Sequence, residues 1–281
     1  MSKNLSISFE FFPPQTAEGI EKLNATRKQL VPLKPEFFSV TFGAGGSTRD
    51  RTLETVQQIQ ADGYSAAPHL SCVGSTRDNI RAILQTYKIL GIKRIVALRG
   101  DLPSGMATTG EFQYANELVS FIRAETGDHF HIEVAAYPEF HPQAKSPRDD
   151  LLNFERKVKA GADSAITQYF YNADSYFYFV EQCHKLGITI PIVPGIMPIG
   201  KFSQLARFSD ACGAEIPRWV RKTLESYGDD SASIQAFGME VVTKMGERLL
   251  AGGAPGLHFY TLNQAAPSLE IWKRLGLQVS P

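Results

Sequence analysis

Several carboxylates, imidazoles and basic side chains of this sequence stand where they could move a proton or hold an anion. Glu10 lies in the apolar run Ile-Ser-Phe-Glu-Phe-Phe. A carboxylate in such surroundings is costly unless it is solvated or paired, and desolvation raises its pKa. Glu10 is therefore a candidate general acid; the alternative is an outward-facing glutamate on an irregular first strand.

Other polar residues end or follow short apolar runs. They are Thr41, His69, Arg99, Gly100, Asp101, Tyr137, Glu139, His141, Gln168, Tyr260 and Asn263. Singly, each has a structural explanation, such as a hydrogen-bonded histidine or an Arg–Asp ion pair. Their recurrence at the end of one apolar run after another favours a shared functional site.

A basic pair follows the fifth of these runs. Asp150, Asn153, Arg156 and Lys157 occur within two turns of a predicted helix that opens at Asp150. A helix start with two cations suits a phosphate or pyrophosphate. The alternative is ordinary: Asp150 caps the helix and the basic pair is a solvated face.

A divalent metal ion is a competing ligand for the same region. Its donors would be Glu10, His69, Asp101, Glu139 and His141. The HxH pattern of metal-dependent amidohydrolases is missing from the first strand, however, and no ligand pair has helical i, i+4 spacing. The three cysteines are widely spaced and form no CxxC pair. The sequence predicts neither a metal site nor a disulfide framework.

The composition bounds the class of protein. The chain has 281 residues, and 29 Lys and Arg balance 29 Asp and Glu, so it has no electrostatic reason to bind nucleic acid or an anionic bilayer. Its first residues lack the apolar core of a signal peptide, and no run of about 18 apolar residues could span a membrane. With 43% hydrophobic residues, the chain is expected to be a compact cytoplasmic protein.

Elements that alternate along the whole chain must position these residues. Eight β-branched or aromatic runs are predicted strands: Ile7–Phe12, Phe37–Phe42, Ala66–Val73, Arg94–Leu98, Ile132–Tyr137, Ala165–Tyr171, Ile190–Ile196 and Leu257–Leu262. Between them lie stretches with helical spacing that usually end near a glycine, as helices often do. Alternating strand and helix predicts parallel strands joined by crossovers.

Eight such units fit a closed (βα)8 TIM barrel in a single domain, residues 1–281. The competing fold is a doubly wound open sheet, but Thr48 stands where its GxGxxG fingerprint needs the third glycine. The segment Phe202–Gly252 is longer than one helix needs, and Pro217 and Gly228-Asp229-Asp230 divide it. An extra helix or extended loop is therefore expected before strand eight. In this fold, functional groups cluster at the carboxyl ends of the strands.

Seven motifs, in order, resemble those of the bacterial methylenetetrahydrofolate reductase family. They are Ser8–Pro14, Ser39–Ala44, Ala67–Leu70, Leu98–Pro103, Ala135–Pro142, Ile166–Gln168 and His258–Asn263. Seven motifs in the family's order are far more specific than any one of them, and they run from the first strand to the last. Because the chain ends soon after the eighth unit, no C-terminal regulatory domain is expected.

The resemblance implies a flavoprotein oxidoreductase. Through bound FAD it would pass a hydride from NADH or NADPH to 5,10-methylenetetrahydrofolate in a ping-pong reaction, giving 5-methyltetrahydrofolate for methionine synthesis. The implied catalytic residues are Glu10 and Asp101. The implied FAD-binding residues are Thr41, Phe42, Ala44, His69, Arg99, Gly100, Asp101, Tyr114, Tyr137, His141, Ala144, Asp150, Asn153, Arg156 and Lys157. The implied substrate-binding residues are Glu10, Asp101, Gln168, Phe202, Tyr260 and Gln264.

These implied roles agree with the chemistry. Opening the folate's five-membered ring needs a proton on N10, a task for a carboxylic acid with a raised pKa, which Glu10 would supply. A negative Asp101 beside the flavin would make the reduced ring a better hydride donor and could stabilise a cationic iminium.

Two positions depart from the family pattern. Gln264 stands where an arginine is usual, which predicts a weaker hold on the folate's glutamate tail, and Phe42 replaces a frequent tyrosine. The resemblance favours NADH over NADPH and a homo-oligomer. Two other functions stay open: an FAD barrel of the proline dehydrogenase type, which would call for an arginine pair near strand eight, and a non-catalytic barrel that binds folate or a nucleotide, which would not need Glu10.

Overall fold

The structure is a computed structural model that describes residues 5–43, 48–101 and 110–279. One predicted site residue, Ala44, lies outside these ranges. The strands are β1 (Ser6–Phe11), β2 (Phe37–Val40), β3 (Ala66–Ser71), β4 (Arg94–Leu98), β5 (His131–Ala136), β6 (Ser164–Thr167), β7 (Ile192–Val193), β8 (Gly195–Ile196) and β9 (Gly256–Tyr260). They lie close to the predicted positions: most end one to four residues earlier than predicted, and most start at the predicted residue or one residue before it.

All strand pairs are parallel, in the order β7-β6-β5-β4-β3-β2-β1-β9-β8. The two outer strands, β7 and β8, are consecutive in the chain, so the segment that joins them closes the barrel. The prediction of one strand over Ile190–Ile196 is wrong in detail, because Pro194 interrupts it. Proline has no N–H for the ladder, but its carbonyl accepts from the N–H of His258 at 3.0 Å. The predicted (βα)8 barrel is confirmed.

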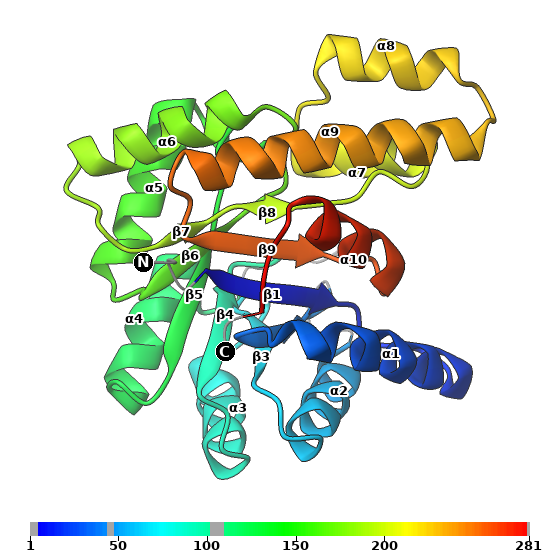
Figure 1. The fold of residues 1–281 in the computed structure, drawn as a ribbon. Helices are drawn as coiled ribbons and strands as arrows, with labels where there is room; N and C mark the ends of the chain where they lie inside the picture. Colours follow the sequence, from blue (N-terminus) through cyan, green and yellow to red (C-terminus); the bar gives the residue numbers. More distant parts are fainter. Residues whose placement is uncertain (1–4, 44–47, 102–109, 280–281) are drawn as a thin grey trace.

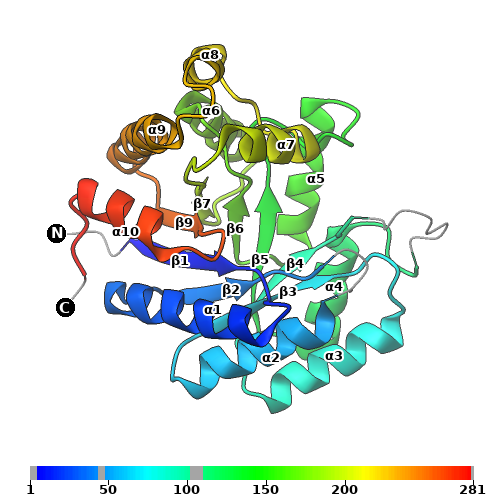
Figure 2. The ribbon, with the colours of Figure 1, turned by 90° about the vertical axis from the view of Figure 1, so that its right-hand side faces the viewer.

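Helices surround the strands on the outside (Figures 1 and 2). They are α1 (Ala17–Leu30), α2 (Arg49–Ala61), α3 (Arg77–Ile89), α4 (Ala115–Thr126), α5 (Pro147–Lys159), α6 (Ala173–Lys185), α7 (Phe202–Cys212), α8 (Arg218–Ser226), α9 (Ser231–Ala251) and α10 (Ala265–Arg274), with a 3-10 turn, η1 (Val31–Leu33), after α1. Their apolar stripes face the sheet. In α3, for example, Ile80, Ile83, Leu84 and Tyr87 are buried at the i, i+3, i+4 spacing of one helix face.

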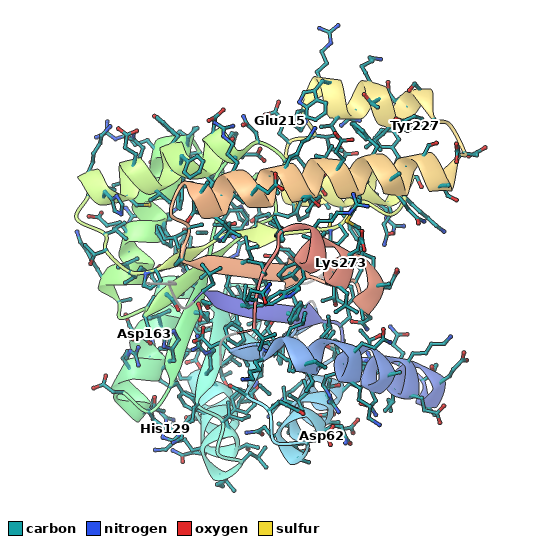
Figure 3. The ribbon with its side chains drawn as sticks, viewed as in Figure 1. Asp62, His129, Asp163, Glu215, Tyr227 and Lys273 are labelled. Carbon is teal, nitrogen blue, oxygen red and sulfur yellow. The ribbon has the colours of Figure 1, made fainter. Side chains whose placement is uncertain are left out.

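The segment before the last strand contains extra helices, as expected. Pro217 precedes α8 as its N-cap, and Asp230 caps α9 by accepting from the N–H groups of Ala232 and Ser233. The predicted break points therefore separate α7 from α8 and α8 from α9. Glu215 and Tyr227, labelled in Figure 3, precede and follow α8, which lies against the long α9 on the outside of the barrel.

Charged side chains fill the amino end of the barrel. Arg94, the first residue of β4, donates to the carboxylates of Glu36 and Glu133. Glu133 also accepts from Ser164 Oγ at 2.6 Å, and His131 Nε2 lies 3.3 Å from it. Burial raises the pKa of Glu133, but His131, Arg94 and Ser164 together lower it below its ordinary value. This network ties β2, β4, β5 and β6 together.

In the part of the chain that the structure describes, no helix is long and apolar enough to cross a membrane.

Candidate functional site at the carboxyl end of the barrel

Two adjoining cavities open where the strands end. The larger has a volume of about 420 Å³, and its wall includes Glu10, Phe12, Thr41, Phe42, His69, Val96, Leu98, Ala135, Tyr137, Ile166, Gln168, Tyr169, Met197, Phe208, Ala211, Cys212, Tyr260, Thr261 and Leu262. The smaller has about 240 Å³ and is lined by Ala97, Leu98, Arg99, Gly100, Asp101, Tyr114, Ala115, Asn116, Ala135, Tyr137, His141, Gln143, Ala144, Asp150, Asn153 and Lys157. Because Leu98, Ala135 and Tyr137 line both, one elongated ligand could occupy the two together.

The larger cavity is mostly apolar, and Glu10 is the one carboxylate among the described residues of its wall. Its side chain is 12% exposed, and its Oε2 lies 3.2 Å from His69 Nε2 and 3.5 Å from His258 Nε2. Both nitrogens are close enough for charge interaction with the carboxylate, although neither makes a hydrogen bond of good geometry. Thr261 fixes the strand beneath by donating from its hydroxyl to the Glu10 carbonyl at 2.6 Å.

The expectation of a raised pKa for Glu10 is wrong for the ligand-free protein. Burial does raise the pKa, as the apolar run around it predicts. The charges and hydrogen-bonding capacity of His69 and His258 outweigh burial and lower the pKa to about 2. Glu10 is therefore ionised at neutral pH and has to gain a proton before it can act as an acid.

The smaller cavity is polar and contains a buried cation. Lys157 donates from its ammonium to the carbonyl of Ala135, and burial lowers its pKa to about 8 although the Asp150 carboxylate opposes the shift. Burial, followed by the charge of Arg99, also lowers the pKa of His141. Arg99, which is half-buried, and Asp101, which is exposed, also line this cavity. This group of donors is suited to phosphate oxygens.

The helix that carries Lys157 begins earlier than predicted. The N-cap of α5 is Ser146, whose hydroxyl accepts from the Asp149 N–H at 3.1 Å, with Pro147 at the first helical position. The interpretation of Asp150 as the cap is therefore wrong. Its carboxylate instead accepts from the His141 N–H at 3.0 Å and so holds the loop after β5 over the cavity.

Most of the predicted site residues meet at these two cavities. Three described ones do not line either: Arg156, Phe202 and Gln264. Arg156 is exposed and donates to Asn153 Oδ1 at 2.5 Å. Phe202 begins α7, whose later residues Phe208, Ala211 and Cys212 do reach the larger cavity. Gln264 is exposed as the residue preceding α10. Their predicted binding roles stay predictions.

Two residues named among the candidates have structural contacts. Asn263 makes paired hydrogen bonds with the backbone N–H and carbonyl of Phe12, at 2.8 and 3.0 Å, and so joins the ends of β1 and β9. Gly100 has φ +84°, and a Cβ there would lie 1.8 Å from Ser71 Oγ. Any other residue at position 100 would displace the strand end that bears Arg99 and Asp101.

Sequence reasoning missed the role of His258 and Ser8. His258 is fully buried, and its Nδ1 lies 2.7 Å from Ser8 Oγ. The period-two alternation of strands gave a usable signal, because it places Ser8 beside Glu10 on one face of β1 and His258 beside Tyr260 on one face of β9. Nothing local connects the two strands, which are 250 residues apart in the sequence.

The five residues considered as metal donors do not come together. Glu10 and His69 face the larger cavity, whereas Asp101 and His141 line the smaller one. Glu139 lies apart, where its carboxylate accepts from the Glu215 N–H at 2.7 Å. Within residues 5–43, 48–101 and 110–279, no group of three or more His, Cys, Asp or Glu side chains is arranged to hold a metal ion.

Comparison with known proteins assigns the family. The chain is 43% identical to 5,10-methylenetetrahydrofolate reductase of Escherichia coli over 275 residues, which are 98% of this chain and 92% of that relative. It is 40% identical to methylenetetrahydrofolate reductase (NADH) 1 of Zea mays over 286 residues, 97% of this chain but 48% of that protein.

A solved structure shares the fold. An uncharacterised protein from Clostridium thermocellum, which binds two copies of 5-methyl-5,6,7,8-tetrahydrofolic acid, matches with a TM-score of 0.71 over 96% of both chains, at 16% identity. The family model described as methylenetetrahydrofolate reductase matches residues 1–276. The chain belongs to the methylenetetrahydrofolate reductase family.

Proposed function

We propose that the protein reduces 5,10-methylenetetrahydrofolate to 5-methyltetrahydrofolate with NAD(P)H, using FAD. The observation that carries this proposal is the carboxylate of Glu10, which lies near two imidazoles in the wall of an apolar cavity that adjoins a polar, cationic one. Ring opening of the substrate needs one acid beside a flat apolar slot, and a dinucleotide cofactor needs an anion site next to that slot.

The residues present fit FAD. The polar cavity offers Arg99, His141 and Lys157 as donors for its phosphates, and the apolar cavity offers Thr41, Phe42 and His69 beside its ring site. Of the predicted FAD-binding residues that the structure describes, all but the exposed Arg156 line one of the two cavities. When bound, FAD supplies the two-electron chemistry that links NAD(P)H to the folate.

The chain's own residues would orient the substrate and control its proton. Glu10 would give a proton to N10 of the folate, so that the ring opens to the iminium at N5. Gln168, in the same cavity wall, offers an amide for the pterin, and its side-chain oxygen accepts from the Tyr169 N–H at 3.0 Å. Asp101 would place negative charge where the iminium becomes cationic.

NADH is the favoured reductant, because the plant relatives carry NADH in their names. The folate-binding neighbour of the same fold supports a folate in the larger cavity. A homo-oligomer, a cytoplasmic location and a single catalytic domain over the (βα)8 barrel complete the proposal.

Anaerobic stopped-flow kinetics test it. The purified protein is loaded with FAD and mixed with NADH or NADPH, and the flavin absorbance is followed; the reduced protein is then mixed with methylenetetrahydrofolate. We expect faster bleaching with NADH and full reoxidation with one 5-methyltetrahydrofolate formed per flavin. A protein that binds folate but no flavin would instead be a carrier barrel. Bleaching by proline rather than NAD(P)H would identify the amino-acid dehydrogenase alternative.

A further inference from the structure

A third cavity lies between the N-terminal halves of α1 and α2, two helices that are side by side in Figures 1 and 2. It has a volume of about 110 Å³ and is lined by Pro14, Ile20, Leu23, Asn24, Arg51, Glu54, Thr55 and Gln58. Among the described residues, its wall shares none with the two cavities at the strand ends. This cavity, the α1–α2 groove, suits a side chain rather than a whole cofactor.

Arg51 brings a cation to the groove. Its Nε is buried, yet within the part of the chain that the structure describes it has no hydrogen-bond partner. The backbone here is fixed, because the Arg51 carbonyl accepts from Thr55 Oγ1 at 2.8 Å. Arg27, buried on α1, differs in that its guanidinium donates to the Asp62 carboxylate. Since a buried N–H without an acceptor costs free energy and a guanidinium fork matches a carboxylate, Arg51 is suited to an acidic ligand.

The rest of the groove favours a ligand with methylene groups and amides as well as a carboxylate. Ile20 and Leu23 of α1 give it an apolar wall, and Ile20 is exposed there although it is a large hydrophobic residue. Asn24 and Gln58 offer one side-chain amide from each helix. Glu54 lines the same wall and repels anions, so a carboxylate of single charge is favoured over a phosphate. A chain of γ-linked glutamates has this composition, because each unit adds two methylenes, an amide and one free carboxylate.

The groove is close to the edge of the larger cavity. Phe12, which is exposed, lines that cavity, and Pro14 lines the groove. Two residues of extended chain span at most about 7 Å. Paired hydrogen bonds with Asn263, at 2.8 and 3.0 Å, hold Phe12 in place. A γ-linked glutamate is longer than an α-linked residue, since its methylenes lie in the main chain, so one or two units would bridge this distance.

We propose that the α1–α2 groove binds the outer glutamates of a folate with a poly-γ-glutamate tail, and that Arg51 pairs with a tail carboxylate. The tail would leave the larger cavity past Phe12 and pass Pro14 on its way to the groove. This inference rests on the proposed function and names its substrate class, which is folates with several glutamates in preference to folates with one.

Steady-state kinetics of the FAD-loaded protein test this preference. The substrates are methylenetetrahydrofolates with one glutamate and with several γ-linked glutamates. We expect the Michaelis constant of the parent to be about three- to tenfold lower for the longer tail, as one partly exposed, charge-assisted contact predicts. Arg51→Gln should abolish most of this difference and leave the constant for the short tail unchanged, whereas Arg51→Lys should keep part of it. Flavin reduction by NADH should be the same in all variants.

Two further variants separate charge in the groove from charge nearby. Glu54→Gln removes the repelling carboxylate, so it should increase the preference for the longer tail. Arg49→Gln is the matched control, because Arg49 is exposed two residues before Arg51 and donates to Asn79 Oδ1 at 2.9 Å, outside the groove. It should leave the preference as it is in the parent. Equal Michaelis constants for both tails in the parent, or the same preference in parent and Arg51→Gln, would overturn the proposal.

Nitrogen NMR of arginine-labelled holoprotein gives a readout that does not depend on turnover. On titration with tri-γ-glutamate, which lacks the pterin, we expect the Arg51 Nε resonance to shift and that of Arg49 to stay in place. A shift in a protein that fails to reduce methylenetetrahydrofolate would support the groove and refute the proposed function. Folate reduction without a shift and without a preference for the longer tail would refute the groove alone.

Discussion

Glu133 at the amino end of the barrel and Glu10 at its carboxyl end are both buried carboxylates beside histidines, but their partners differ. Glu133 shares Arg94 with Glu36, accepts from Ser164 and lies near His131, so its charge is fully paired. Glu10 has two imidazoles within 3.5 Å and an aligned hydrogen bond from neither.

The cations show the same contrast. At the amino end, Arg94 binds two carboxylates and lies 4.4 Å above the Phe37 ring. At the carboxyl end, the buried ammonium of Lys157 donates to a backbone carbonyl, and burial lowers its pKa to about 8. Charges that stabilise the barrel are paired with one another, whereas charges at the ligand end keep bonding capacity for something else.

The largest effect on stability is expected from Glu133→Gln. The amide removes the charge that Arg94 needs, and breaking a buried ion pair typically costs several kcal/mol. Because Arg94 still has Glu36 as a partner, we expect the free energy of unfolding to fall by about 3 kcal/mol, the lower end of the range for a broken buried ion pair. Chemical denaturation measures this loss. The control is Glu181→Gln, which breaks the exposed ion pair between Glu181 and Lys185 on α6 and should leave the denaturation midpoint unchanged. An equal loss in Glu10→Gln would erase the contrast between the two ends.

Lys157 and Arg156 are neighbours in the sequence, but Lys157 lines the smaller cavity and Arg156 lies on the surface. Lys157→Met should weaken FAD binding about 10- to 100-fold, because a charge-assisted hydrogen bond to phosphate is lost. Arg156→Ala should change it threefold or less, since this side chain is exposed outside both cavities. Fluorescence titration with FAD gives both constants. The reverse order would mean that Arg156 turns inward when the cofactor binds.

The pH dependence of FAD binding gives a second test at Lys157. An anionic ligand prefers the protonated ammonium, and the ligand-free pKa is about 8. Affinity should therefore be constant from pH 6 to about 7.5 and decrease as the pH rises through 8, until the higher pKa of the bound state is reached. Lys157→Arg should keep the affinity but flatten this dependence, because guanidinium stays charged. A flat profile in the parent would place the phosphates elsewhere.

The smallest effect is expected at Gln264, on the exposed rim. Gln264→Arg should lower the Michaelis constant for the folate by about two- to fivefold, because one exposed ion pair with the glutamate tail stabilises binding by about this factor. Flavin reduction by NADH should not change. Steady-state kinetics with folates that carry one or several glutamates would show the effect. Identical Michaelis constants for the parent and Gln264→Arg would mean that the tail does not reach position 264.

The sequence predicted the strands and the cavity walls because both depend on local pattern. Period-two and helical spacing identify the elements, and the fold places the strand ends together, so Thr41, His69, Arg99 and Gln168 could be assigned to one site. The break at Pro194 and the cap at Ser146 also had local signals, a proline inside a predicted strand and a serine before proline, which could have been used.

The charge state of Glu10 could not be predicted in this way. The apolar residues around it in the sequence indicate a raised pKa, but the groups that lower it come from β3 and β9, and His258 is distant in the chain. Orientation is similarly non-local: Arg156 and Lys157 are adjacent, yet the turn of α5 leaves Arg156 exposed and places Lys157 in the wall of the smaller cavity. Long-range packing, which the sequence does not display, decides both.

The acid role of Glu10 is tested most directly by separating the two half-reactions in Glu10→Gln. The amide keeps the shape and hydrogen-bonding capacity but has no transferable proton. We expect it to bind FAD and to be reduced by NADH within about tenfold of the parent rate, whereas reoxidation by methylenetetrahydrofolate falls by about 10²-fold or more. Equal slowing of both half-reactions would show that Glu10 only positions its neighbours, and undiminished folate reduction would show that the proton comes from another group.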